Sequence, residues 1–159
     1  MSKIRFTEPN REILARRDSI INDLTRLVDP AGLITSTDEC RAYETDALTA
    51  YRKMPLAVVL PKTTEEVSAV LKYCHDTGVK VVPRGAGTSL AGGAIPSEDA
   101  VVLGLSKMNR VLAVNYDDRF IRVEAGVTNL SVTAVVAENG FFYAPDPSSQ
   151  LACTIGGNI

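Results

Sequence analysis

The fold is decided by the stretch PLAVVLPKTTEEVSAVLKYCHDTGVKVVPRGAGTS, residues 55–89. It opens with the continuous apolar run 56–60, which is typical of a strand buried on both faces of a sheet. Pro61 ends the run. The Thr63-x-x-Glu66 spacing then matches a capping box, in which a hydroxyl and a carboxylate satisfy free backbone N–H groups, and so predicts a helix start.

The helix in this stretch is predicted from its apolar periodicity. Apolar residues recur at i, i+3, i+4 and i+7 from Val67 to Cys74 and form one face. Gly78 ends the helix because glycine adopts the left-handed conformation freely. The run 79–82 predicts a second strand, so the unit is strand–helix–strand with short connections, and its two strands should be parallel.

A glycine-rich segment, PRGAGTSLAGG at residues 83–93, follows the second strand. Glycines let the backbone approach a ligand and turn several N–H groups to one side, and such concave rows of amides bind phosphate oxygens. The segment does not match either of two standard nucleotide-binding patterns. The Rossmann pattern G-x-G-x-x-G requires glycine where this sequence has Leu90, and the P-loop pattern requires lysine where it has Gly93. The alternative is a glycine-rich turn that merely joins two strands.

The flanking segments predict further elements and a second glycine-bearing loop at 152–158. Residues 35–54 are polar and irregular, which indicates a connecting segment on the surface. Residues 144–149 are also expected to be irregular. The remaining elements are an amphipathic helix over 9–28, strands at 100–104, 111–115 and 120–125, and a helix capped at Thr128 or Asn129, running to about Asn139 before Gly140, with Val132, Val135 and Val136 facing inward.

Composition excludes several classes of protein. With 159 residues, the chain has about the length of one domain, and 17 basic against 19 acidic residues leave a net charge of −2 without a basic footprint for nucleic acid. Three widely spaced cysteines, Cys40, Cys74 and Cys153, favour reduced thiols. The one histidine, His75, cannot build a histidine metal site and is expected to interact with the last carbonyls of its helix.

The expected location is the cytoplasm. No apolar run approaches the roughly 18 residues that span a bilayer. Residues 1–6 lack the apolar core of a secretory signal. Direct membrane insertion is therefore not expected, and any membrane association should come through partners.

Several motifs in order resemble one family. The run 55–94, VEAGVTN at 123–129, PDPSS at 145–149 and TIGGNI at 154–159 are similar to the FAD-binding domain of the vanillyl-alcohol oxidase/p-cresol methylhydroxylase superfamily. The similarity is greatest to the branch with FAD-linked D-lactate dehydrogenases and the flavin subunit of bacterial glycolate oxidase. The resemblance covers roughly residues 20–159 and implies an FAD-binding fold that is not of the Rossmann type.

The expected fold is α+β, with a small parallel βαβ subdomain followed by the beginning of a mainly antiparallel subdomain. Residues 1–54 would form an N-terminal helix and connecting segment. Residues 55–159 would form the FAD-binding domain, truncated at its C-terminal end, because the family continues past the Gly-Gly-Asn loop. The chain is therefore expected to be a fragment.

The resemblance also implies how FAD is held. Several members carry a histidine, covalently linked to the flavin, where this sequence has Thr88, and a hydroxyl cannot form that link, so non-covalent FAD is expected. Arg84 through Ser89 would wrap the pyrophosphate. The full set of expected cofactor-binding residues is Arg84, Gly85, Ala86, Gly87, Thr88, Ser89, Pro145, Asp146, Cys153, Thr154, Gly156, Gly157, Asn158 and Ile159.

The implied activity is that of a flavin-dependent 2-hydroxy-acid dehydrogenase, in which glycolate or D-lactate loses a hydride from Cα to the flavin. Expected partners are the hydroxy acid, a second flavin subunit and an iron–sulfur subunit. Catalytic residues and metal ligands are expected beyond Ile159, so none is assigned within the chain. Alternatives are an oxidoreductase of the same superfamily with another substrate, a non-enzymatic module for a phosphate-bearing ligand, and a purely structural domain.

Overall fold

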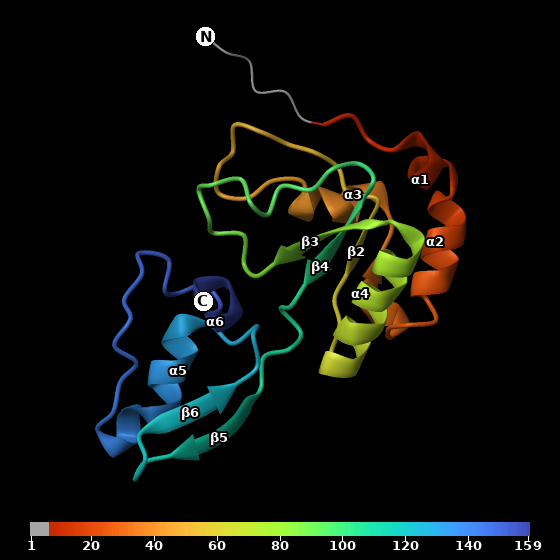
Figure 1. Ribbon diagram of the computed structural model, residues 1–159. Coiled ribbons are helices and arrows are strands. Elements are labelled where there is room, and N and C mark those ends of the chain that lie inside the picture. The colour runs from red at the N-terminus through yellow and green to blue at the C-terminus, as the bar shows by residue number, and fades with distance from the viewer. Residues whose placement is uncertain (1–6) are drawn as a thin grey trace.

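The computed structural model describes residues 7–159, so the N-terminal stretch 1–6, for which no secretory signal is expected, lies outside the described residues. Figure 1 shows a larger unit built on a four-stranded sheet and a smaller unit around a β-hairpin. The helices are α1 (Arg11–Ala15), α2 (Arg17–Leu24), α3 (Thr37–Cys40), α4 (Thr64–Thr77), α5 (Asn129–Val136) and α6 (Ile155–Asn158), with 3-10 turns η1 (Pro30–Gly32), η2 (Arg41–Tyr43) and η3 (Ala137–Asn139). The strands are β1 (Leu33–Ile34), β2 (Ala57–Val59), β3 (Lys80–Arg84), β4 (Ala100–Gly104), β5 (Val111–Asn115) and β6 (Phe120–Val123).

The larger sheet has the strand order β1-β2-β4-β3. Strands β2 and β3 each pair in parallel with β4, and Val102 of β4 is the partner of both Val58 and Val82. The two strands of the predicted strand–helix–strand unit are therefore parallel, as expected. The sequence did not indicate that β4 would lie between them, nor that β1 would pair antiparallel with β2.

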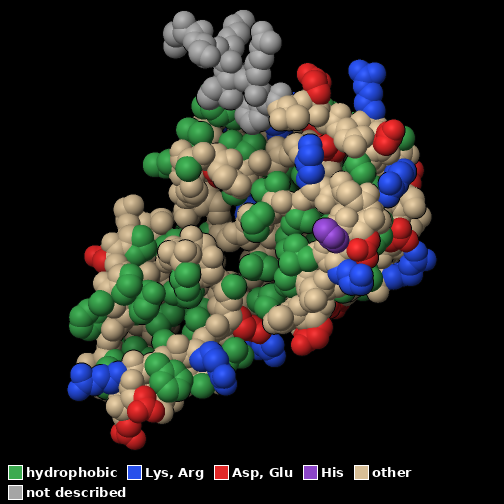
Figure 2. Space-filling view, in the orientation of Figure 1, with side chains coloured by type: hydrophobic (Ala, Val, Ile, Leu, Met, Phe, Trp, Pro, Cys, Tyr) green, Lys and Arg blue, Asp and Glu red, His purple; other side chains and the backbone are tan. Residues whose placement is uncertain are grey.

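The smaller unit contains the antiparallel pair β5 and β6, joined in register from Asn115↔Phe120 to Val111↔Val123 with one irregularity. Helix α5 lies beside the hairpin in Figure 1. Apolar side chains gather on the visible surface of this unit (Figure 2). Leu112, Phe120 and Phe142 of the unit are 49, 50 and 74% exposed. A mainly parallel unit, with β1 as its one antiparallel strand, followed by an antiparallel hairpin confirms the predicted α+β fold.

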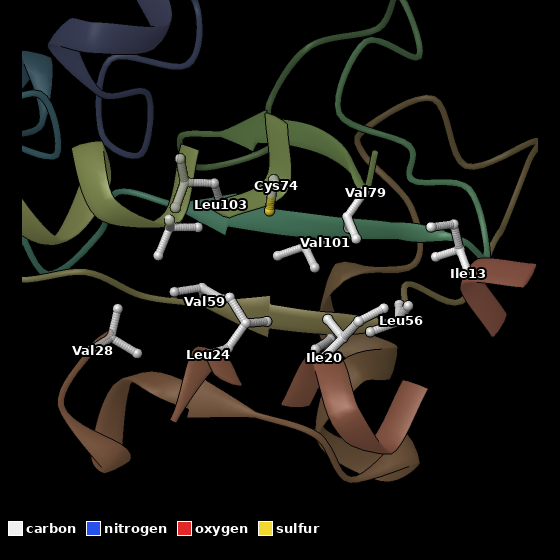
Figure 3. Packing of buried hydrophobic residues seen from close by; sticks show 12 residues of the cluster. Ile13, Ile20, Leu24, Val28, Leu56, Val59, Cys74, Val79, Val101 and Leu103 are labelled. Atoms are coloured by element: carbon white, nitrogen blue, oxygen red, sulfur yellow. The ribbon is translucent and has the colours of Figure 1, made fainter. Parts of the chain in front are cut away.

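The core of the larger unit explains why its strands are apolar throughout. One face of the sheet packs Val59, Val101 and Leu103 against residues of α2 and α4 such as Leu24 and Cys74 (Figure 3). The alternate residues of the same strands pack on the other face with Cys40 and Tyr43. Both faces are covered, so the continuous apolar pattern of a doubly buried strand is required.

The predicted caps of the long helices are confirmed. The Thr63 hydroxyl accepts a hydrogen bond from the Glu66 backbone N–H at 3.2 Å, and Gly78 ends α4 at φ +74°. Thr128 caps α5 in the same way, and Gly140 ends the following 3-10 turn at φ +77°. These termini were predictable because capping depends on local sequence.

Two predictions for the N-terminal part were wrong. The segment 9–28 is not one helix, since Arg16 leaves the helical region at φ −96° and ψ 8° and separates α1 from α2. The buried positions of this segment still follow the predicted apolar residues, including Ile13, Ile20 and Leu24. The segment 35–54 is not irregular throughout, because Ser36 caps α3 by accepting a hydrogen bond from Glu39 N–H at 3.4 Å.

Three details near the C-terminal end also differ from the predictions. Val135 is 43% exposed, because α5 directs Val132 and Val136 inward instead. The strand expected over 120–125 ends at Val123. The second glycine-bearing loop, expected at 152–158, contains one helical turn, α6, in which Asn158 N–H donates a hydrogen bond to Thr154 O at 3.1 Å.

Candidate cofactor-binding site

A cavity lies between the two glycine-bearing loops. The first loop leaves the carboxyl end of β3, and the second immediately precedes and includes α6. The cavity has a volume of about 190 Å³. Its lining residues are Pro83, Gly85, Ala86, Gly87, Thr88, Ser89, Gly93 and Ala94 from the first loop and Cys153, Thr154, Gly157 and Asn158 from the second.

Backbone hydrogen bonds fix the second loop on the segment that leads into α5. Ile155 N–H donates to Val127 O at 2.8 Å, and Gly156 N–H donates to Ala125 O at 2.9 Å. The approach is so close that a Cβ on Gly156 would come 2.7 Å from the Ala125 Cβ. Glycine is therefore needed at this position for packing, independently of any ligand.

The lining of the cavity carries hydroxyl and amide groups but no charged side chain. None of its twelve residues is Asp, Glu, Lys or Arg. Hydroxyl groups come from Thr88, Ser89 and Thr154, and Asn158 contributes an amide whose Nδ2 lies 3.5 Å from the Cys153 sulfur. Hydroxyls, amides and glycine backbone can surround a phosphate without repelling it.

Arg84 faces a different direction from the cavity. Its Nη1 donates a hydrogen bond to Thr45 O at 2.7 Å, and its guanidinium carbon lies 5.5 Å from the centre of the Tyr43 ring. Burial lowers the pKa of Arg84, while its electrostatic interactions with Tyr43 and Asp46 act to raise it. Arg84 lines a neighbouring cavity of about 220 Å³ that also contains Gly156.

Three of the expected site residues lie outside both cavities. Pro145 and Asp146 are exposed on the irregular segment before α6, and the Pro145 carbonyl accepts a hydrogen bond from Asn129 Nδ2 at 3.1 Å. Ile159 is 99% exposed. The structure thus brings together nine of the fourteen expected residues in the first cavity and adds Arg84 and Gly156 in the second.

One contact to the first loop was missed by sequence reasoning. Ala47 N–H donates a hydrogen bond to Gly87 O at 2.9 Å, which places the segment around Thr45 and Ala47 against the loop. No motif in the polar stretch 35–54 marks this contact. It depends on the tertiary path of the chain.

The remaining candidate groups lie away from the cavity. His75 is exposed in the last turn of α4. Cys74 is buried in the core, and this burial raises the pKa of its thiol to about 11, which disfavours the reactive thiolate. Within residues 7–159 there is no group of three or more His, Cys, Asp or Glu side chains that could hold a metal ion, and no helix in that range is long and apolar enough to cross a membrane.

A protein-family model described as an FAD binding domain matches residues 55–159. The chain belongs to this family of FAD-binding domains. The matched residues include both glycine-bearing loops, so the cavity lies entirely within the part of the chain that matches the family model. The expected cofactor of the family, FAD, is thereby confirmed.

Two relatives of this FAD-binding domain are named for the oxidation of glycolate and, putatively, of D-lactate. The glycolate oxidase subunit GlcD of Escherichia coli K12 is 46% identical over 143 residues, which are 90% of this chain and 29% of that protein. A putative mitochondrial D-lactate dehydrogenase of Schizosaccharomyces pombe is 32% identical over 147 residues, 92% of this chain and 27% of that protein. The chain therefore spans less than a third of the length of these relatives.

A solved structure supports the fold of the FAD-binding domain. p-Cresol methylhydroxylase with bound substrate superposes with a TM-score of 0.70 at 21% identity, over 83% of this chain and 26% of that one. The family model and the E. coli relative confirm the predicted resemblance, and this structure adds the likeness in fold. The fold is of that type and not of the Rossmann type.

Proposed function

We propose that this domain holds FAD non-covalently within a larger oxidoreductase that oxidises a 2-hydroxy acid. The observation that carries the proposal is the cavity of about 190 Å³ between two glycine-bearing loops, at the carboxyl end of β3. The pyrophosphate would lie in this cavity, between the first glycine-bearing loop (83–93) and the second (152–158).

The residues present fit a phosphate-bearing cofactor. The cavity contains hydroxyls from both loops and no carboxylate, so a pyrophosphate meets donors without a repelling charge. At Gly93 a Cβ would meet no other atom within 4 Å, which leaves open space beside the backbone. A cavity of about 190 Å³ accommodates only part of FAD, so the rest would extend beyond it.

Thr88 decides the mode of attachment in this proposal. It lies in the cavity lining, and a hydroxyl does not form the histidine–flavin bond. The one histidine is on the surface of α4 and is absent from that lining. The protein would therefore retain FAD only by non-covalent contacts.

The substrate class is proposed from the relatives. Glycolate and D-lactate, named for the two relatives above, share a hydroxyl group on the carbon next to a carboxylate. When bound, the flavin supplies the acceptor for the hydride leaving that carbon. The residues described here position the cofactor, whereas the groups that bind the hydroxy acid and accept its proton would lie outside residues 7–159.

Partners and location belong to the same proposal. The E. coli relative is named as a subunit, which supports assembly with other chains, and a second flavin subunit and an iron–sulfur subunit are the proposed ones. A cytoplasmic location, with membrane association through partners, is proposed from the sequence. The mitochondrial relative shows that location varies among such proteins.

The test uses the intact protein of which this chain is part. After purification it should be yellow and carry one FAD per chain, and it should reduce an artificial dye with glycolate or D-lactate. A colourless protein that binds other phosphate compounds would support a non-enzymatic module instead. A flavoprotein that is inert with 2-hydroxy acids but active on another alcohol would place the domain in a different enzyme of the superfamily.

A further inference from the structure

A closed loop precedes the part of the chain that matches the FAD-binding domain, and we call residues 43–53 the strap. Lys53 N–H donates to Glu44 O at 2.8 Å, and the Thr45 hydroxyl donates to Tyr51 O at 2.8 Å. Tyr43 anchors one end of the strap in the core beside Val102. The strap is therefore a fixed element of the structure, although it lacks regular secondary structure beyond its first residue.

The strap contacts the first glycine-bearing loop at several points. Ala47 N–H donates to Gly87 O, and Arg84 Nη1 donates to Thr45 O. Further along the loop, a Cβ on Gly92 would lie 3.5 Å from Leu48 Cδ2. The loop that would hold FAD is thus supported by residues outside the matched domain.

The Arg84 side chain lies between the loop and the strap. A Cβ on Gly87 would overlap the Arg84 guanidinium, so that guanidinium occupies the side-chain face of Gly87. Gly87 lines the cavity, but Arg84 does not. The guanidinium therefore contacts the strap and the side-chain face of Gly87, and Arg84 is absent from the lining of the first cavity, although it lines the neighbouring one of about 220 Å³.

A buried carboxylate lies next to this contact. Asp46 is 4% exposed, and its Oδ1 accepts a hydrogen bond from Leu48 N–H at 2.9 Å, whereas its Oδ2 has no hydrogen-bond partner among the described residues. The negative charge of Asp46 favours the charged form of Arg84. The strap therefore offers the guanidinium a carbonyl, an aromatic face and a nearby negative charge.

We infer that Arg84 is a positioning residue for FAD and that its side chain does not touch the phosphates. It fastens the strap to the loop, and the strap in turn holds Gly87 in the left-handed conformation that shapes the cavity. This inference rests on the proposed function, because it concerns how the loop is preorganised for FAD. It assigns a cofactor-related role to residues 43–48, which lie outside the matched family model.

The experiment measures FAD affinity of the intact apoprotein at several salt concentrations. Arg84→Gln removes the charge, and Arg84→Lys keeps the charge but loses the planar fork that reaches Thr45 O and stacks on Tyr43. Both variants should bind FAD about 10- to 100-fold more weakly, since a hydrogen bond from a charged group is lost. The salt dependence of binding should be the same as in the wild type, because no phosphate contact is removed.

A phosphate contact by Arg84 predicts a different pattern. Lysine would then largely rescue affinity as a point charge, and Arg84→Gln would flatten the salt dependence. Either result would overturn the inference. Arg41→Gln is the matched control, since it removes an exposed arginine near the strap that pairs only with exposed Asp38 among the ion pairs described, and it should leave affinity unchanged.

Two further measurements separate positioning from general loss of structure. Hydrogen exchange at the Ala47 amide should accelerate in Arg84→Gln, while exchange in α4 stays protected. Tyr43→Leu combined with Arg84→Gln should weaken FAD binding no more than the stronger single variant, because both act through one contact. Fully additive effects would contradict the inference. If the wild-type protein binds no FAD, the proposed function fails first and the role of Arg84 fails with it.

Discussion

The hydroxyl oxygen of Thr154 occupies the space that a Cβ atom on Gly85 would need. Gly85 follows β3, and Thr154 precedes α6, so this contact joins the two loops that line the cavity. Gly157 lies in the same contact, since a Cβ there would come 3.3 Å from the same oxygen. The close approach of the two loops therefore depends on the absence of a side chain at Gly85 and Gly157 and on the hydroxyl of Thr154.

Gly85→Ala should separate the loops. The new methyl group overlaps the Thr154 hydroxyl, and such overpacking destabilises by about 1–3 kcal/mol. The FAD content of the purified intact protein should fall, together with its thermal stability. Removing the hydroxyl in Gly85→Ala/Thr154→Ala should recover part of the stability, because the next atom, the Thr154 Cβ, is 3.7 Å away. A single variant as stable as the wild type would show that the loops adjust freely.

Gly87→Val should largely abolish FAD binding while the protein remains folded. Gly87 adopts φ +73°, which is strained by about 1–3 kcal/mol for other residues, and its side-chain position is already filled by Arg84. Gly78→Val is the matched control, with φ +74° and no atom within 4 Å of its Cβ. The control should lose stability but keep FAD. Normal flavin content in Gly87→Val would refute the assignment of the loop.

Stability at low pH should depend on Asp99. Burial acts to raise the pKa of this carboxyl, but hydrogen bonds from Lys80, Ser97 and the Asn10 backbone outweigh it and lower the pKa to about 2. Because the folded-state pKa is depressed, the stabilisation is present above the unfolded pKa of about 4 and is lost as the pH falls toward 2. Its size is about 2 kcal/mol.

Urea denaturation of the wild type and Asp99→Asn measures this effect. The difference in unfolding free energy should be largest near about pH 6 and narrow to about half by about pH 3. In Lys80→Met the carboxyl of Asp99 loses the ammonium that lies 2.8 Å from its Oδ2 but keeps the hydrogen bond from Asn10 N–H. The difference in unfolding free energy between wild type and Lys80→Met should therefore also narrow toward low pH, but by less than the difference for Asp99→Asn. A difference that stays constant across this range would contradict the assigned ionisation.

FAD should leave the protein on acid or heat denaturation, because Thr88 offers no covalent attachment. After precipitation of the intact protein, the yellow flavin should be found in the supernatant. Denaturing gel electrophoresis of the same sample should show a band without flavin fluorescence. Flavin that remains with the precipitated polypeptide would refute non-covalent binding.

Residues 1–159 expressed by themselves should bind FAD weakly, lack activity on glycolate and D-lactate, and aggregate. The exposed apolar side chains of the smaller unit, including Phe142 and Leu151 at 74 and 78%, are the physical reason. Replacing both with Ser should reduce light scattering, whereas Leu90→Ser, 72% exposed in the glycine-rich loop, should help less. Micromolar FAD binding together with turnover would contradict this prediction.

Local signals in the sequence predicted much of the fold. The cap at Thr63 and the glycine stops at Gly78 and Gly140 are short-range features, and each lies where it was expected. The break at Arg16 and the outward position of Val135 were not predictable from periodicity. Both depend on how the helices pack in the tertiary structure, which can override local helix propensity.

The candidate site was predictable in composition but not in geometry. The two glycine-bearing loops were recognised by their residue types, and nine of the expected residues line one cavity. The direction of the Arg84 side chain could not be inferred, because its partner Thr45 lies in a polar segment without a motif. The contact between Gly85 and Thr154 likewise required the path of the whole chain.

The strand order has a consequence for how the molecule assembles. Strands β2 and β3 are made before β4, yet each forms its parallel ladder only with β4. A nascent chain that ends after Arg84 therefore has the helix but no parallel sheet. Strand β4 must insert between β2 and β3, so the connecting segment 85–99 takes up its path in the same event that completes the hydrogen-bonded ladders. Placement of the cofactor loop and nucleation of the core are thus one step, and lengthening or stiffening this segment should slow folding of the whole unit.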